Sequence, residues 1–586
     1  MAEMSVDTLR RKIDEVKRFL DVALRISNAH TVDFYARDVW DEFVAVRPEE
    51  VTARVYPGHA HVVAPDGNEQ SNFGFSRGNG KLVDVGAFLQ AAKANALPGL
   101  GVCVPRAEVL HVFSESDKPP QDAGTLEPDE FMNCKKSHEV QAMSEVVARL
   151  AKRCKLKQVI DVGSGKGYLC SYLSMRYGLQ VFGVDSSSTN THGAQERNRK
   201  LKKFSKAYQT HSKAARKHQE TSEGANSSQP GLNEEEDDSK CAPQKDINVN
   251  GVVGDEVRIP LKEPVGTRDG SLDQDTADLF FSALSLDVVE TVSPRIPPNE
   301  LSKEEKERRK RENLKRKARS GADSRDSSLF STLTSYVTAE TELGDIIPEL
   351  EDAVMVGLHT CGDLAPSTLR MFAAKRELQA VCSVGCCYHL LTEVSDPSRR
   401  EGGNGVCGFP MSRYLKDQNT FCGRNARMSA CLALERVTVG GGLPMESLFY
   451  RAVLHVILQD HFDAYKSEKR VGNVYAKAST FVDYIRRALR RLDLDESKLS
   501  DDVIQAYHDH FQPRMSEMVA FNLLKVTLAP CIEGFILLDR LCFLKEQDNV
   551  SYSALVQLFD PLTSPRCYAI VGVKTPRDTT KPTASF

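Results

Sequence analysis

A short glycine-rich segment after an apolar stretch constrains the fold of this chain more than any other feature. Residues 161–167 read DVGSGKG, after a buried strand expected at 157–162 and before a helix expected at 165–175. A second apolar strand is expected at 179–184. Glycines let the backbone turn tightly and approach a ligand closely. A strand, a glycine loop, a helix and a second strand predict the start of a doubly wound α/β sheet.

The spacing of this loop differs from the common phosphate-binding patterns. A dinucleotide fingerprint needs glycine at position 168, which is Tyr168, and no Lys-Ser/Thr pair follows the last glycine as in a P-loop. Asp161 would repel a pyrophosphate but can pair with a cationic amino-acid end. Asp185, at the end of the second strand, can accept both hydroxyls of a ribose. The alternative is a tight strand–helix turn without a ligand. The pattern predicts that S-adenosylmethionine is bound by Asp161, Gly163, Ser164, Gly165, Gly167, Asp185 and Ser186.

The composition is that of an intracellular protein with several domains. At about 100–200 residues per domain, 586 residues predict two to four units. The net charge of −4 argues against polyanion binding driven by bulk charge, though not against a local basic patch. No apolar run of about 18 residues and no signal-peptide pattern is present, so we expect no membrane association. Fifteen cysteines without a spacing framework favour a reduced location, cytoplasmic and/or nuclear.

Residues 195–328 interrupt the α/β pattern. They contain an acidic run at 234–238 and a mixed-charge stretch at 303–319 with ten basic and four acidic residues. Because so few apolar residues are present, we expect a disordered insertion. It could recruit a partner protein. The stretch 303–319 could also be a nuclear localisation signal or a nucleic-acid contact. A solvated charged helix is the alternative.

Several longer stretches resemble the methyltransferase-like protein 25 family. The resemblance covers most of the chain outside 195–328 and the C-terminal tail. It implies a class I methyltransferase fold, a Rossmann-like seven-stranded sheet with an antiparallel last strand. It also implies an S-adenosylmethionine-dependent methyltransferase whose acceptor is not established. The matching stretches are KKSHE (135–139), IDVGSGKGYL (160–169), VFGVDSS (181–187), VGLHTCGDL (356–364), VGCCYHL (384–390), FPMSRYL (409–415), LFYRAVLH (448–455), LLDRLCFLKEQ (537–547) and LFDPLTSPR (558–566).

With this resemblance, the chain divides into seven parts. The methyltransferase domain is interrupted twice, by the disordered insertion and by helices after the fifth strand. The expected parts are an N-terminal helical region (1–130), the first part of the methyltransferase domain (131–194), the insertion (195–328), the second part of the domain (329–395), a helical insertion (396–515), the C-terminal helix and strand hairpin of the domain (516–575) and a disordered tail (576–586).

The acceptor is expected where strands four and five end, because ligands of such sheets bind beyond the carboxyl ends of the strands. Strand four is expected to end at Leu358, and strand five near Gly385. Methyl transfer needs an aligned acceptor and sometimes removal of a proton. A histidine here could be the base or could only orient the acceptor. The predicted catalytic residues are His359, Cys361, Asp363 and His389.

The cysteines near this edge allow two further readings. A thiol of Cys361, Cys386 or Cys387 could attack C6 of a pyrimidine, which would permit methylation at C5, or these cysteines could simply be small buried hydrophobic residues. Alternatively, Cys361, Cys386, Cys387 and His389 could bind zinc. Adjacent residues on a strand point to opposite faces and no C-x-x-C motif occurs here, so we predict no metal. The HxCG motif at 359–362 and the CCxH motif at 386–389 also resemble a eukaryotic tRNA 2′-O-methyltransferase family.

The leading hypothesis is therefore methyl transfer to an acceptor that is RNA or protein. The alternative is a non-catalytic scaffold that binds S-adenosylmethionine and recruits partners through residues 195–328.

Overall fold

The computed structural model describes residues 4–55, 71–113, 132–201, 329–394, 407–432, 434, 445–462, 471–472 and 474–576. Residues 188–201 are helical, so the first residues of the predicted insertion are ordered, contrary to the expectation. Buried Ala194 packs in the same core as Phe330, and the Asn198 side chain bonds the Phe330 carbonyl. The predicted disorder of 202–328 and of 577–586 lies outside the described residues.

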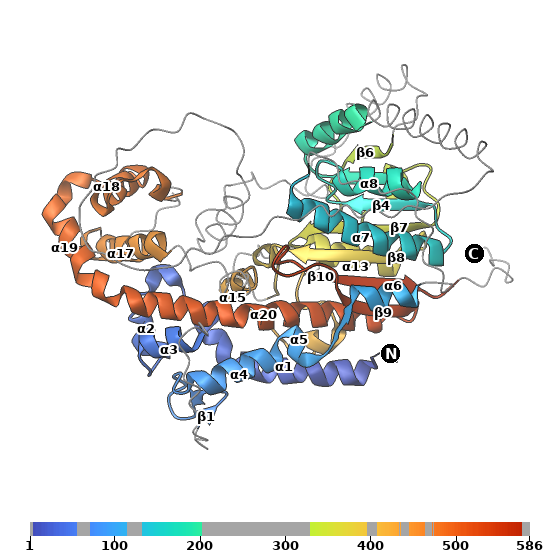
Figure 1. Cartoon of the computed structure of the whole chain (residues 1–586). Coiled ribbons are helices and arrows are strands. Elements are labelled where there is room, and N and C mark those ends of the chain that lie inside the picture. The colour runs from blue at the N-terminus through green and yellow to red at the C-terminus, as the bar shows by residue number, and fades with distance from the viewer. Residues whose placement is uncertain are drawn as a thin grey trace, which may run out of the picture. The chain divides into compact units, whose positions relative to one another are not determined.

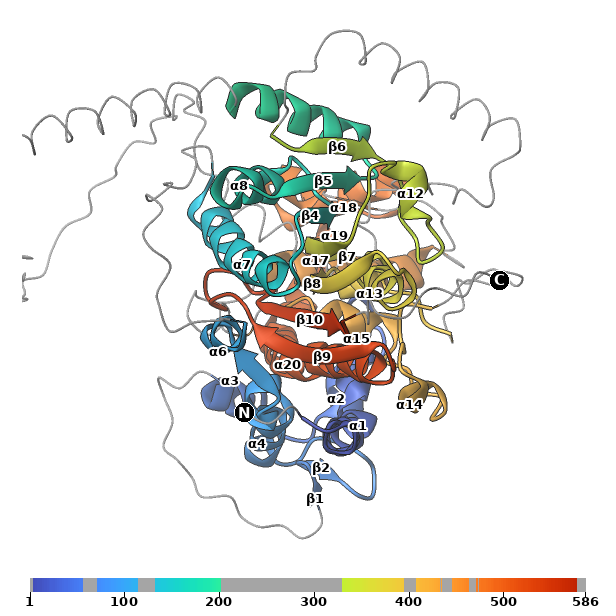
Figure 2. The ribbon, with the colours of Figure 1, turned by 90° about the vertical axis from the view of Figure 1, so that its right-hand side faces the viewer.

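A mostly parallel sheet of eight strands forms the centre of the fold. The strand order is β3-β9-β10-β8-β7-β4-β5-β6 (Figure 2). β10 runs antiparallel to both of its neighbours, as the hairpin near the C-terminus predicts. The strands are β3 (Cys103–Pro105), β4 (Gln158–Val162), β5 (Gln180–Asp185), β6 (Ser331–Thr334), β7 (Ala353–Cys361), β8 (Leu378–Cys386), β9 (Val550–Gln557) and β10 (Tyr568–Lys574).

The N-terminal region forms one strand of the central sheet and a separate hairpin, in addition to the predicted helices. Its three-residue strand β3 pairs in parallel with β9 and extends the expected seven strands to eight. A hairpin of β1 (Ser71–Asn72) and β2 (Phe75–Ser76) also forms there. The N-terminal helices are α1 (Val6–Asn28), α2 (Val39–Phe43), α3 (Pro48–Val55), α4 (Val85–Asn95), α5 (Leu97–Leu100) and α6 (Arg106–Val112).

Helices cover both faces of the sheet, because alternate strand residues point to opposite faces. Val159 packs in one core cluster with helix α7 (Cys134–Arg153) and helix α8 (Tyr168–Tyr177). Ile160 packs in the other with α13 (Leu364–Ala374) and the long helix α20 (Met515–Lys545). Figure 2 shows α7 and α8 on one side of the strands and α13 on the other. The sheet is doubly wound, as the sequence predicts.

The helix α20 connects the sheet to the N-terminal helices. It packs against α1, α3 and β9, and Figure 1 shows α1 and α3 alongside it. Among the described residues, the helical run Asp501–Lys545 alone is long and apolar enough to cross a membrane, by length and composition. Its most apolar window is 94% buried inside the protein, as in a core helix.

The described residues between β8 and α20 are mostly helical, where a helical insertion is predicted. Helices α17, α18 and α19 pack on one another, and α17 also contacts α20. The helices not yet named are α12 (Leu343–Ile346), α14 (Arg413–Lys416), α15 (Arg424–Ser429), α17 (Met445–His461), α18 (Phe481–Arg491) and α19 (Asp501–Phe511).

Candidate active site

The glycine loop lies between β4 and α8, at the point where the sheet reverses its winding direction. Gly163, Gly165 and Gly167 have φ of 72°, 55° and 72°, in the left-handed region that favours glycine. A Cβ at Gly163 would lie 3.3 Å from the His359 carbonyl oxygen, and one at Gly167 would lie 2.5 Å from the Phe330 ring. A Cβ at Gly165 would meet nothing within 4 Å. The outer glycines therefore permit close packing, whereas Gly165 borders open space.

Asp161 presents one free carboxylate oxygen beneath this loop. The residue is only 2% exposed. Its Oδ2 accepts a hydrogen bond from the Cys170 thiol, with the sulfur 3.1 Å away. Its Oδ1 has no hydrogen-bond partner among the described residues. Burial raises the pKa of Asp161 to about 7, although the Cys170 thiol acts in the opposite direction. A buried acceptor without a donor fits a cationic ligand group.

Asp185 closes the other side of the loop. Its Oδ2 accepts the Gly165 N–H at 3.0 Å, and its Oδ1 accepts the Ser187 N–H at 2.7 Å. The Asn190 side chain also donates to Oδ1 at 3.2 Å. A carboxylate can accept about four hydrogen bonds, so part of its capacity is left for a ligand. Ser164 lies within the loop, where its N–H bonds the Val184 carbonyl.

The structure thus brings the predicted cofactor residues together at the carboxyl ends of β4 and β5. Ser186, which follows Asp185 directly, is exposed at the same edge.

His359 lies on β7 and is bonded to a buried carboxylate that the sequence analysis did not assign to the site. Its Nε2 is 3.2 Å from Glu139 Oε2, and the Ser564 hydroxyl donates to Glu139 Oε1 at 2.7 Å. Burial raises the pKa of Glu139, but the hydrogen bonds from His359 and Ser564 outweigh it, so the pKa is lowered overall. The His359 side chain is 41% exposed. The pair can therefore orient a histidine whose ring still reaches solvent.

Three thiols meet where β7 and β8 end. Strand β7 ends at Cys361, three residues beyond the predicted end, and β8 ends at Cys386, one residue beyond it. The two cysteines are register partners. Their sulfurs are 3.0 Å apart. Hydrogen bonds from Cys386 and Cys387 lower the pKa of Cys361 and outweigh its burial. The expectation that Cys386 and Cys387 point to opposite faces is wrong, because Cys387 lies past the strand with φ of 51°.

The other two predicted catalytic residues are held by neighbouring protein groups. Asp363 precedes α13, and its Oδ1 accepts the Thr392 N–H at 3.0 Å. His389 lies after β8, and its Nδ1 is 3.5 Å from Cys431 Sγ. Burial lowers the pKa of His389. Both lie near the predicted acceptor edge, and their catalytic roles stay predictions.

A buried polar network supports the turn after β8. The Tyr388 hydroxyl donates to Glu533 Oε1 at 2.7 Å, and Arg566 Nη1 lies 3.0 Å from the same oxygen. Arg566 also donates to the Ala430 carbonyl at 2.8 Å. The network joins the turn, α20 and the segment 558–566. The sequence signal for this network is the FDPLTSPR stretch at 559–566, which contains Arg566.

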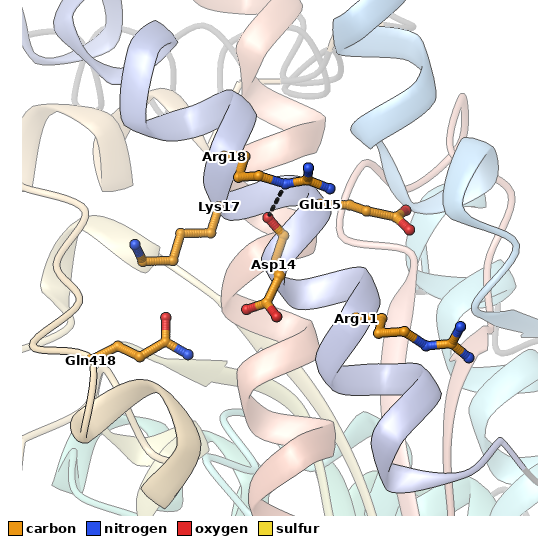
Figure 3. Close-up of a pocket in the computed structure, with 6 residues that line it drawn as sticks. All are labelled: Arg11, Asp14, Glu15, Lys17, Arg18 and Gln418. Atoms are coloured by element: carbon orange, nitrogen blue, oxygen red, sulfur yellow. Dashed lines mark hydrogen bonds between the residues drawn. The ribbon is translucent and has the colours of Figure 1, made fainter.

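A surface pocket of about 510 Å³ lies away from these residues, along α1 (Figure 3). Its charged groups have partners within the protein: Asp14 accepts from the Tyr414 hydroxyl, and Lys17 pairs with Asp21. It holds none of the predicted site residues. Its lining residues are Arg11, Asp14, Glu15, Lys17, Arg18 and Gln418.

The strand order, the glycine loop and the two carboxylates define a methyltransferase. In agreement, the family described as "Methyltransferase domain" matches residues 135–394. The chain is 46% identical over 589 residues to "Probable methyltransferase-like protein 25" of Mus musculus, covering 97% of each chain. It is 46% identical over 599 residues to the protein of the same name from Homo sapiens, again covering 97% of each. No solved structure matches. The chain belongs to the methyltransferase-like protein 25 family.

Proposed function

We propose that this protein transfers a methyl group from S-adenosylmethionine to an acceptor at the carboxyl ends of β7 and β8. The observation that carries the proposal is the buried, unpartnered Oδ1 of Asp161, in the same β4–α8 segment as Gly165, which borders open space. A protein without a ligand there would leave a buried acceptor unsatisfied at a cost of about 1–3 kcal/mol.

The residues at the ends of β4 and β5 suit each part of that cofactor. Asp161 would receive the cationic amino-acid end. The backbone at Gly165 would allow close approach of the adenosyl group. Asp185, already held by two backbone N–H groups, would accept the ribose hydroxyls. When bound, the cofactor supplies an electrophilic methyl group on a sulfonium.

The neighbouring strands would position the acceptor. The backbone of His359 lies against Gly163, as the 3.3 Å approach indicates. An acceptor beside the His359 ring would therefore be close to the cofactor loop. Glu139, 3.2 Å from Nε2, holds the ring in place, so His359 would align the acceptor or take its proton.

For the acceptor we propose RNA or protein. A group of cations beside the glycine loop supports an anionic acceptor. Lys136 Nζ and the Arg197 guanidinium lie 4.5 and 4.1 Å from the centre of the Tyr168 ring. We also propose an intracellular location, cytoplasmic and/or nuclear, no membrane association and recruitment of partner proteins through residues 195–328.

Calorimetry with S-adenosylmethionine tests the cofactor site directly. Wild type should bind with one site per chain, and Asp161→Asn should bind at least about tenfold more weakly. Asp345→Asn, an exposed aspartate on α12, is the matched control and should bind like wild type. Absence of binding to folded wild-type protein would overturn the proposal. Cofactor binding without transfer to any acceptor would favour the scaffold alternative.

A further inference from the structure

We propose that Cys361, Cys386 and Cys387 form a binding site for one thiophilic divalent metal ion, with zinc as the best match. The inference goes beyond methyl transfer and does not depend on it. It reverses the expectation from the sequence that this edge holds no metal.

The backbone explains why the three thiols converge. Cys361 and Cys386 are register partners on adjacent parallel strands, and each is the last residue of its strand. Cys387 then adopts φ of 51° and ψ of 50°, a conformation that non-glycine residues adopt rarely and often at functional positions. This turn brings the third sulfur to the same side, so that all three lie within 4.8 Å of one another.

The spacing suits a sulfur-coordinated ion. Zinc binds thiolates at about 2.3 Å in a tetrahedron, whose edges are then about 3.8 Å. The Cys361 and Cys386 sulfurs are 3.0 Å apart, which is shorter than this edge length. No two of the three sulfurs are more than 4.8 Å apart, which is longer than the edge length. Small side-chain rotations would therefore equalise the three distances. Cys361 is exposed, which gives an ion a route from solvent.

A buried cation beside the cluster matches the charge of such a site. Three thiolates and a divalent ion carry one net negative charge. Arg540 is 1% exposed, and its Nε and Nη2 have no hydrogen-bond partner among the described residues. Its Nη1 lies against Gly385, directly before Cys386. Burial lowers the pKa of the Arg540 guanidinium, although Tyr388, Asp539, Asp363 and Cys386 act in the opposite direction. Negative charge at the cluster would therefore add to the compensation that the two carboxylates give this buried cation.

Three protein ligands leave one coordination position for water or an acceptor atom, as in catalytic rather than structural zinc sites. Among the described residues, only the three cysteines have ligand atoms within 4.8 Å of one another here, and His389 is not part of that group. A disulfide is the competing fate of Cys361 and Cys386. It would need only two of the three thiols, and it would not explain the turned backbone of Cys387.

The test uses full-length protein purified in a reducing buffer. Elemental analysis should find one zinc ion per chain. After removal of the metal by a chelator, Co²⁺ should restore a thiolate-to-cobalt charge-transfer band with saturation at one equivalent. Cys361→Ser should lower the Co²⁺ affinity at least about tenfold. Cys154→Ser, at a half-buried free cysteine that directly follows α7, is the matched control and should bind like wild type.

Circular dichroism would confirm that each variant is folded, and Cys387→Ser provides a second arm if Cys361→Ser fails to fold. A reduced, folded wild type without zinc and without a cobalt charge-transfer band would overturn the site. So would unchanged metal binding in both variants, or mass spectrometry that shows a Cys361–Cys386 disulfide in the reduced preparation. None of these results depends on whether the protein binds S-adenosylmethionine.

Discussion

The two halves of the candidate site differ in how much of their polar surface is already used. At the ends of β4 and β5, Asp161 keeps a free buried oxygen and Gly165 borders open space. At the ends of β7 and β8, His359 bonds Glu139, and Asp363 bonds the Thr392 backbone. The first half offers an unused acceptor to a ligand, whereas His359 and Asp363 in the second half are held by contacts within the protein.

This difference indicates different tasks. A cofactor site gains affinity when its backbone is rigid and its hydrogen-bond acceptors are already in the bound arrangement before the ligand arrives. An acceptor site gains more from fixed orientation of a few side chains, because reacting atoms must be aligned closely. Substitutions in the first half should therefore change cofactor affinity, and those in the second should change turnover.

The largest expected effect is that of Asp185→Ala on cofactor affinity. The change removes the acceptor of the Gly165 and Ser187 N–H groups and the proposed ribose contact. Hydrogen bonds to a charged group are worth about 1.5–3 kcal/mol each, so calorimetry should show at least about 100-fold weaker binding. Asp185→Asn, which keeps one carbonyl acceptor, should lose less. Equal affinity of Asp185→Ala and wild type would contradict this assignment.

His359→Ala should distinguish the acceptor half of the site, at the ends of β7 and β8, most clearly from the cofactor half, at the ends of β4 and β5. Turnover should fall by about 10- to 100-fold, because the acceptor loses its orienting or basic group. The dissociation constant of S-adenosylmethionine should stay within about twofold. His111→Ala, at an exposed histidine on α6, is the control for both measurements. A weakened cofactor affinity with unchanged turnover would show that His359 belongs to the cofactor half, which would contradict its assignment to the acceptor.

The open space at Gly165 can be tested against an equivalent glycine outside the site. Gly165 and Gly178 have φ of 55° and 66°, and a Cβ at either would meet nothing within 4 Å. Both alanine variants should lose about 1–2 kcal/mol of unfolding free energy, because both positions are left-handed. Only Gly165→Ala should also weaken cofactor binding, by about tenfold. Equal affinities in calorimetry would show that no ligand approaches Gly165.

The smallest effect is a pH dependence from Asp161. Its pKa is raised to about 7, and only the ionised carboxylate pairs with a cation. Cofactor affinity should therefore rise with pH, by about threefold between pH 6.5 and 7.5. The same raised pKa means that the stability of the free protein falls as pH rises from about 4 through about 7. Asp161→Asn should remove both trends, and a pH-independent wild-type affinity would contradict the assignment.

The sequence predicted the sheet well, and it predicted which residues meet at the ends of β4 and β5, because both depend on local patterns. The strand before residues 161–167 and the hairpin at the C-terminus are visible as apolar runs with glycine or proline boundaries. Strand β3 was missed because three residues, one of them Pro105, give no period-two pattern. It forms only because the edge of β9 is available for pairing.

The acceptor half depends on contacts between distant residues, which a single sequence does not show. Glu139 and His359 are 220 positions apart in the chain, and their bond follows from the packing of α7 on β7. The position of the Cys387 side chain depends on a backbone φ of 51°. A cysteine in the sequence does not signal such a left-handed conformation. The helix continues to residue 201 because Asn198 bonds Phe330 and Leu329 beyond the insertion.

Methyl transfer from labelled cofactor tests the central claim most directly. S-adenosyl-L-[methyl-³H]methionine would be added to lysate from cells that lack this protein, together with purified wild type or Asp161→Ala. Fractions would be digested with RNase or with protease. Label should enter one fraction with wild type only, and the digestion that it survives would identify the acceptor class. Equal label with both proteins, once calorimetry has confirmed that wild type binds the cofactor, would contradict the account.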